Sequence, residues 1–192
     1  TQLDKIRKTM KKDGVDGIKI TFLPFLIKAA TSVLQEMPIF NSSLDHTKEH
    51  LILKKYYHIG IAVNTDDGLV VPVVRDVEKK SIFDLSQELM DISNRARNKK
   101  LKPNEMKGGT FTISSLGGIG GTAFSPIVNP PEVAILGISR SALRPVYNPE
   151  SSNFVPRLIM PFSLSYDHRV IDGAAAAMFT QRFSEALNEI QE

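Results

Sequence analysis

Hydrophobic residues recur at helical spacing near the start of the chain, and they predict two helices. Leu3, Ile6 and Met10 indicate a first helix that begins with the first residues. Thr21 can cap a second helix, in which Pro24 is tolerated because it falls in the first turn. Pro38 is expected to end this helix, whose buried side would carry Phe22, Phe25, Leu26, Ala29, Val33 and Met37.

Two further helices are predicted later in the chain. Ser81 followed by Asp84 resembles a capping box, in which two side chains satisfy backbone N–H groups at a helix start. The same spacing of apolar residues continues with Ile82, Leu85, Leu89, Ile92 and Ala96. This helix is expected to end near the basic stretch 95–102, and a last helix is predicted over residues 174–190.

Runs of β-branched and aromatic residues predict strands in the middle of the chain. Residues 57–63 and 69–74 flank the polar turn 64–68 and are expected to pair as a hairpin. Three more strands are expected at residues 110–114, 133–139 and 158–166. Because the strands are grouped between helices, the pattern predicts one α/β (α+β) domain with a mixed sheet flanked by helices.

Composition narrows the classes of protein that fit. The 192 residues are 42% hydrophobic and 23% charged, which is ordinary for a soluble globular domain, and no window approaches the ~20 apolar residues of a membrane span. The absence of cysteine excludes disulfides and thiolate metal sites. A net charge of +3, from 24 Lys and Arg against 21 Asp and Glu, is too small to indicate a nucleic-acid partner.

The segment Tyr166–Gly173 lies where a strand is expected to end and a helix to begin, a place where α/β folds often present reactive side chains. His168 is the best candidate for a general base. From these residues alone, an alternative stays open in which His168 is a structural histidine and Asp172 only a helix cap.

A second candidate segment runs from Phe111 to Gly121 and places two hydroxyl groups before a glycine-rich stretch. Ser114 could donate a hydrogen bond to a developing oxyanion. Residues 118–123 also match the dinucleotide pattern G-x-G-x-x-A, which requires a helix immediately afterwards. We reject that interpretation because three prolines follow, at Pro126, Pro130 and Pro131.

Other polar residues carry weaker signals. His46 and His50 have a spacing that zinc ligands use, but they fall in an expected turn without further ligands, so no metal site is predicted. The pairs Lys54-Lys55 and Lys99-Lys100 could meet the phosphates of a nucleotide-like cofactor, or they could be ordinary solvated lysines.

Four segments together resemble one protein family. FTISSLGGIGGTAFSPIVNPPEVAILGISRS and SLSYDHRVIDG are similar to the core of dihydrolipoyl acyltransferases of 2-oxo-acid dehydrogenase complexes, and IGIAVNTDDGLVVPVVRDV and LPFLIKAA fit the same family. The resemblance covers nearly the whole chain and rests most specifically on the signature H-x-x-x-D-G. It is strongest to the acetyltransferase branch of bacterial pyruvate dehydrogenase complexes, and it favours a catalytic role for His168.

The resemblance implies a fold and a mechanism. The family fold is similar to chloramphenicol acetyltransferase and forms homotrimers with active sites between subunits. His168 would be the general base that takes the proton from the coenzyme A thiol. Ser114, from the adjacent subunit, would donate to the oxyanion. Asp172 would hold the local loop and a nearby cation.

The resemblance also implies substrates and partners. Coenzyme A would be a substrate, and the lipoyl group would be carried on a separate domain. From the residues themselves, Ser115 and Gly117 of the glycine-rich segment and the basic Lys54 are the candidate contacts for coenzyme A. Residues 1–192 are expected to form the catalytic domain without the lead-in, lipoyl and subunit-binding segments. Lipoyl domains and dehydrogenase subunits are the expected partners, without nucleic acid or membrane. The expected location is the bacterial cytoplasm, or the mitochondrial matrix in a eukaryote.

Alternatives of other classes remain at this point. The chain could be a structural scaffold of a dehydrogenase complex, or it could transfer a succinyl or branched-chain group. Acetylation of a hydroxylated antibiotic is a third possibility, which the four family segments disfavour. Since the chain ends before the hydrophobic C-terminal residues that join trimers in the family, we expect trimers with little tendency to build a cube.

Overall fold

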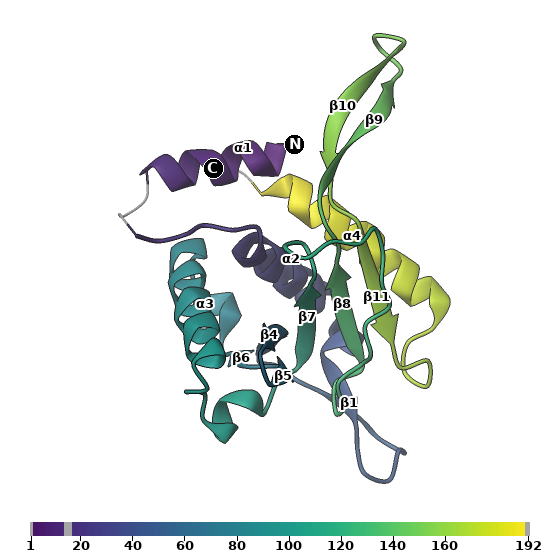
Figure 1. Cartoon of the computed structure of the whole chain (residues 1–192). Coiled ribbons are helices and arrows are strands. Elements are labelled where there is room, and N and C mark those ends of the chain that lie inside the picture. Colours follow the sequence, from purple (N-terminus) through teal and green to yellow (C-terminus); the bar gives the residue numbers. More distant parts are fainter. Residues whose placement is uncertain (1, 14–16, 191–192) are drawn as a thin grey trace.

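The computed structural model describes residues 2–13 and 17–190, in which four α-helices pack beside a central sheet (Figure 1). The helices are α1 (Gln2–Asp13), α2 (Leu23–Glu36), α3 (Ile82–Arg97) and α4 (Gly173–Glu189). Short 3₁₀ helices are η1 (Pro38–Asn41), η2 (Val77–Lys79) and η3 (Pro103–Met106). None of the helices in the described ranges is long and apolar enough to cross a membrane.

The central sheet has five strands in the order β11-β8-β7-β3-β6. Their bounds are β3 (Ile59–Ile61), β6 (Val73–Val74), β7 (Phe111–Ser115), β8 (Ala134–Ile138) and β11 (Phe162–Tyr166). β3, β7 and β8 are parallel, whereas β6 and β11 pair antiparallel at the two edges. The sheet is therefore mixed, as the sequence predicts.

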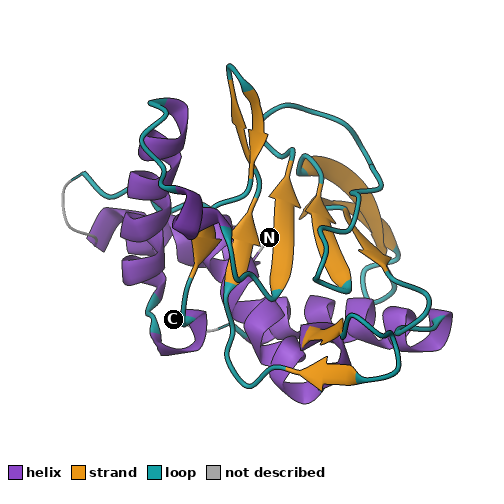
Figure 2. Cartoon of the chain, turned by 90° about the horizontal axis from the view of Figure 1, so that it is seen from below, coloured by secondary structure: helices purple, strands orange, loops and turns teal. Residues whose placement is uncertain are grey.

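Helices cover one face of this sheet, and Figure 2 shows them along one face and one side of the strands. Phe111 and Ile113 of β7 are fully buried in the core, where the Phe111 ring lies 5.8 Å from that of Phe179 in α4. Side chains alternate along a strand, so Thr112 and Ser114 point to the opposite face. The polar positions of β7 thus face away from the helices.

Two of the expected helix starts can be compared with the structure. The capping box of α3 is confirmed, because Ser81 Oγ accepts from Asp84 N and the Asp84 carboxylate accepts from Ser81 N. The expected cap of α2 is wrong by one residue. Its N-cap is Phe22, while Thr21 Oγ1 accepts a 3.3 Å hydrogen bond from Leu23 N.

The hairpin expected over residues 57–74 is present but divided. β3 pairs with β6 inside the central sheet, and beyond them β4 (Val63–Thr65) pairs with β5 (Gly68–Val70) as a separate ribbon. Pro72 lies at the division and lacks the N–H that a continuous ladder would need there. The outer ribbon is thereby free to diverge from the sheet.

The strand expected over residues 158–166 is two strands. β10 (Asn153–Ile159) ends before Pro161, and β11 begins directly after it. β10 pairs with β9 (Ala142–Asn148) in a long hairpin that projects from the body of the molecule (Figure 1). Proline interrupts the ladder, so the chain turns from this hairpin into the central sheet.

Two hairpins of the structure were not expected from the sequence. One is the β9–β10 arm, and the other pairs β1 (Ser42–Leu44) with β2 (Leu51–Leu53). All three side chains of β2 and most of those of β9 are exposed. Both hairpins therefore lack the apolar and polar alternation that would identify a half-buried strand.

Candidate active site

Ser114 is presented at the end of a central strand. It is the last residue but one of β7, is half-buried, and lies opposite Gly137 of β8 in the parallel register. Within the described part of the chain its hydroxyl has no hydrogen-bond partner. The hydroxyl is therefore free to donate to a ligand at the face of the sheet that the helices leave uncovered.

A glycine-rich loop follows Ser114 and borders a cavity. Leu116 N donates to Ile138 O, and the positive φ of 85° at Gly121 is a backbone conformation that glycine adopts without strain. Ser115 and Gly117 line a cavity of about 360 Å³ together with Arg140 and the N-terminal end of α2. Two of the three expected coenzyme A contacts thus share one cavity.

Arg140 is a feature of this cavity that the sequence analysis did not single out. It directly follows Ser139 at the end of β8 and is exposed. The signal available in the sequence was a basic residue next to hydroxyl side chains at the end of an expected strand. Such a residue is informative because the ends of neighbouring parallel strands meet at one edge of a sheet, where ligands bind. Its guanidinium can donate a bidentate pair of hydrogen bonds to a phosphate.

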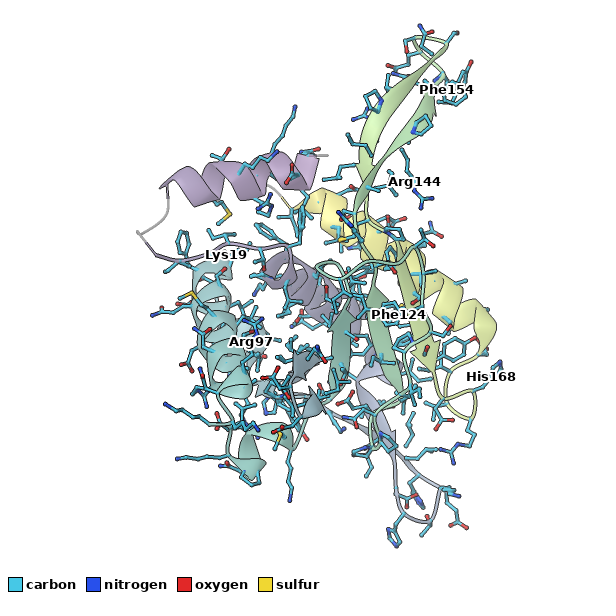
Figure 3. The ribbon with its side chains drawn as sticks, viewed as in Figure 1. Lys19, Arg97, Phe124, Arg144, Phe154 and His168 are labelled. Carbon is cyan, nitrogen blue, oxygen red and sulfur yellow. The ribbon has the colours of Figure 1, made fainter. Side chains whose placement is uncertain are left out.

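His168 lies in the turn between β11 and α4, at the outer edge of the molecule in Figure 3. Its imidazole is exposed, and its ring centre is 5.7 Å from that of Tyr166. The turn is held by the carbonyl of Asp167, which accepts from Val170 N and Ile171 N. His168 is therefore fixed by its backbone while its side chain is open to a partner.

Carboxylates on both sides of His168 support the turn. The side chain of Arg169 donates to the carboxylate of Asp167 and holds the pKa of that carboxyl below its ordinary value. Asp172 is the N-cap of α4, where its carboxylate accepts a 2.7 Å hydrogen bond from Ala175 N. The nearby cation, Arg169, is thus paired with Asp167.

Ser114 and His168 lie far apart within one chain. Ser114 is level with Gly137 of β8, and Gly137 is level with Ser163 of β11, whereas His168 comes after Tyr166, at the far end of β11. Ser114 and Tyr166 are thus two strand spacings apart across the sheet and three residues apart along it. This geometry places the backbones of the two residues at least ~14 Å apart. A serine and a histidine of the same chain cannot act on the same reacting atoms at hydrogen-bond distance.

The third expected coenzyme A contact, Lys54, lies elsewhere. It is half-buried near Glu132, and burial lowers the pKa of its amine despite the opposing charge of that carboxylate. Lys54 does not line the cavity of Ser115 and Gly117. The structure therefore separates Lys54 from the other two residues.

Glu132 is a buried carboxyl that the sequence analysis missed. Burial raises its pKa to about 7, although hydrogen bonds from Thr112 and Asn129 and the charge of Lys54 act in the opposite direction. No sequence pattern marked it, because a lone glutamate after two prolines reads as a loop residue. The structure shows instead that its side chain is only 6% exposed.

The raised pKa of Glu132 predicts a pH dependence of stability. The folded state holds the proton up to about pH 7, against 4.5 for the ordinary carboxyl, so the free energy of unfolding should fall as the pH rises through this window. The full effect is up to about 3 kcal/mol. Denaturant unfolding of wild type and Glu132→Gln from pH 4.5 to 8 checks it. A stability difference between the two that stays constant with pH would contradict the prediction.

The remaining candidates take no part in either segment. His46 and His50 are exposed in the β1–β2 turn, where His50 Nδ1 lies 3.6 Å from Asp45 Oδ2. Lys99 pairs with Asp67 of the β4–β5 turn. Among residues 2–13 and 17–190, no group of three or more metal-binding side chains comes together.

The chain is similar to acyltransferases of known activity. It is 57% identical over 175 residues to the dihydrolipoyllysine-residue acetyltransferase component of the pyruvate dehydrogenase complex of Pseudomonas aeruginosa, covering 91% of this chain and 32% of the relative. The Azotobacter vinelandii component is 53% identical over the whole chain. The chain spans about a third of the length of these curated relatives.

Solved structures agree. The fold matches that of Azotobacter vinelandii dihydrolipoamide acetyltransferase with a TM-score of 0.94 and 52% identity, over 98% of this chain and 77% of the other. The cubic core of a pyruvate dehydrogenase complex matches at 0.92, with the same identity and coverage. Chloramphenicol acetyltransferase matches with a TM-score of 0.59 at 15% identity, over 94% of this chain and 82% of the other. The expected fold is therefore correct. The sequence model of the family "2-oxoacid dehydrogenases acyltransferase (catalytic domain)" matches residues 1–192. The chain therefore belongs to that family.

Proposed function

We propose that the chain transfers an acetyl group between the thiols of coenzyme A and a dihydrolipoyl group, as the catalytic part of a pyruvate dehydrogenase complex. The observation that carries this proposal is the presence of both Ser114, free at a strand end, and His168, exposed in a rigid turn, in a chain of this family. The Azotobacter vinelandii study concerns a serine, a histidine and an asparagine in catalysis. Its histidine and asparagine are four residues apart, the spacing of His168 and Asp172.

The proposed reaction is a direct transfer between two thiols. His168 takes the proton from the coenzyme A thiol, and the sulfur attacks the thioester carbonyl of the acetylated lipoyl group. The carbonyl oxygen becomes negative and accepts a hydrogen bond from Ser114 Oγ. When the intermediate collapses, the lipoyl sulfur leaves and takes the proton from the His168 imidazolium. Histidine suits this exchange because it is the side chain type that gains and loses a proton near neutral pH.

The distance between Ser114 and His168 supports an active site shared by two subunits of a homotrimer. Each site would take the serine from one chain and the histidine from the next. The exposed apolar side chains of the β9–β10 arm support assembly, since an isolated two-stranded ribbon is marginally stable in water. They include Leu143, Tyr147 and Phe154, the last of which is labelled on the arm in Figure 3.

The cavity of Ser115, Gly117 and Arg140 is the candidate site for coenzyme A, with Arg140 in place of Lys54 as the cation for a phosphate. The lipoyl group would arrive on a domain separate from these residues, as part of a complex with dehydrogenase subunits. The relatives named above are bacterial, which supports a cytoplasmic location.

Acyl preference tests the proposed reaction. With free dihydrolipoamide as acceptor, acetyl-CoA is expected to give a kcat/KM about tenfold or more above that of succinyl-CoA, since a second carboxylate needs a committed cation to replace its water. Initial rates with both donors, measured on one protein preparation, check this. A succinyl preference would assign the chain to another branch, and the absence of transfer from either donor would support a scaffold without catalysis.

A further inference from the structure

A buried carboxyl and a buried hydroxyl form a pair behind the proposed serine. Thr112 Oγ1 donates a 2.6 Å hydrogen bond to Glu132 Oε2, and the two side chains are 1% and 6% exposed. Neither lines the cavity of Ser115, Gly117 and Arg140. The transfer reaction described above therefore leaves both without a role.

Thr112 is linked mechanically to Ser114. The two residues lie on the same face of β7, about 6.6 Å apart along an extended backbone. β7 is held on both sides, because Thr112 is in register with Gly60 of β3 and Ser114 with Gly137 of β8. A displacement of Thr112 is thus passed to Ser114 along a stiff strand.

The backbone approaches both members of the pair closely. A Cβ atom added at Gly60 would lie 2.7 Å from Thr112 Oγ1, and one added at Gly109 would lie 2.7 Å from Glu132 Oε1. Both distances are shorter than any ordinary contact of a side-chain carbon. The two glycines thus let the backbone close on the pair and hold it.

Glu132 is itself anchored by its backbone. Its N–H donates to Asn129 O at 3.0 Å, and the next carbonyl, that of Val133, accepts from Asp167 N at 2.8 Å. Asp167 directly precedes His168. The segment 132–133 therefore contacts the strand of Ser114 through a side chain and the turn of His168 through its backbone.

We propose that Glu132 is a positioning residue for Ser114, which it fixes through Thr112 at the point where the serine hydroxyl meets the oxyanion. This inference rests on the proposed function, because it assigns the pair a part in that reaction. Stabilisation of an oxyanion depends on the placement of its donor, and a displacement of ~1 Å can lower the rate by ~100-fold. Loss of one anchoring bond should displace the donor by less than this.

Thr112→Val tests the inference against a matched control. Thr31 is 3% exposed and donates one 2.7 Å hydrogen bond to Ile27 O within α2, so Thr31→Val removes a comparable buried bond outside β7. With acetyl-CoA and free dihydrolipoamide, Thr112→Val is expected to lower kcat about tenfold and to change KM by less than about twofold. Thr31→Val is expected to keep the wild-type kcat.

Glu132→Gln provides a test by conservative rescue. Its amide oxygen can still accept from Thr112, so kcat at pH 7 should stay within about threefold of wild type, whereas Glu132→Ala should lose about as much as Thr112→Val. Amide hydrogen exchange of residues 111–115 gives a readout that does not depend on the reaction. Exchange there should be faster in Thr112→Val and Glu132→Ala and unchanged in Glu132→Gln and Thr31→Val.

The outcomes separate the two proposals. A wild-type chain without transfer activity would reject the proposed function, and the exchange at residues 111–115 would then decide the positioning role alone. With an active wild type, the inference is overturned if folded Thr112→Val keeps the wild-type kcat. It is equally overturned if Thr31→Val loses as much activity as Thr112→Val.

Discussion

Replacement of His168 by alanine is expected to lower the rate of acetyl transfer by about a hundredfold to ten-thousandfold, the usual loss when a general base is removed. The thiol must then lose its proton to water before its sulfur can attack. The fold should persist, because the His168 side chain is exposed and the turn is held by the backbone of Asp167. Steady-state rates with acetyl-CoA and dihydrolipoamide measure the loss.

His50→Ala is the control for this prediction. His50 is also an exposed histidine in a turn, and its substitution should leave the rate unchanged. Far-ultraviolet circular dichroism and the thermal midpoint show whether both variants are folded. Near-normal turnover by a folded His168→Ala protein would remove His168 from the mechanism.

Mixing two inactive variants is expected to restore activity. Ser114→Ala alone should lose about a hundredfold, because it removes an oxyanion donor. If each site combines Ser114 of one chain with His168 of the next, co-refolding Ser114→Ala with His168→Ala in equal amounts creates some sites in which both residues are intact. Random assembly gives one such combination in four, so roughly a quarter of wild-type activity should return.

The two separately refolded variants, combined without exchange of subunits, serve as the control and should stay inactive. A site within a single chain predicts the same inactivity for the co-refolded mixture, since every chain then lacks one of the two residues. Activity restored in the co-refolded sample alone therefore identifies a shared site. Its absence, with subunit exchange verified by mass spectrometry of differently tagged chains, would contradict it.

The elements buried in the core were predictable from the sequence. For α3, the capping box and the helical spacing of apolar residues indicated the same helix. The observed strands β7 and β8 differ from the predicted ones by one residue at their ends. The β9–β10 arm was not predictable, because most of its side chains are exposed on both strands. The periodicity of apolar residues indicates which side chains are buried against the chain's own core. It does not indicate which strands form at exposed positions.

The candidate site was predictable in part for a related reason. His168 and Ser114 stand in distinctive local motifs, so the sequence could single them out without knowledge of their distance. Glu132 could not be identified, because its hydrogen-bond partner Thr112 is 20 residues away in the sequence and comes close only when β7 pairs with β8, which begins two residues after Glu132. Lys54 is grouped with Ser115 and Gly117 only by its charge, and charge does not indicate position, so the fold separates them.

Ser114 and His168 lie on opposite sides of β8 and near its opposite ends, and under the proposed shared site this arrangement also determines how many sites an assembly contains. Each chain would then contribute half of one site and half of another. A linear string of chains then has one complete site fewer than it has members, whereas a closed ring has as many sites as members. Activity per chain becomes a measure of ring closure. Dilution that opens the ring should lower the specific activity before any chain unfolds.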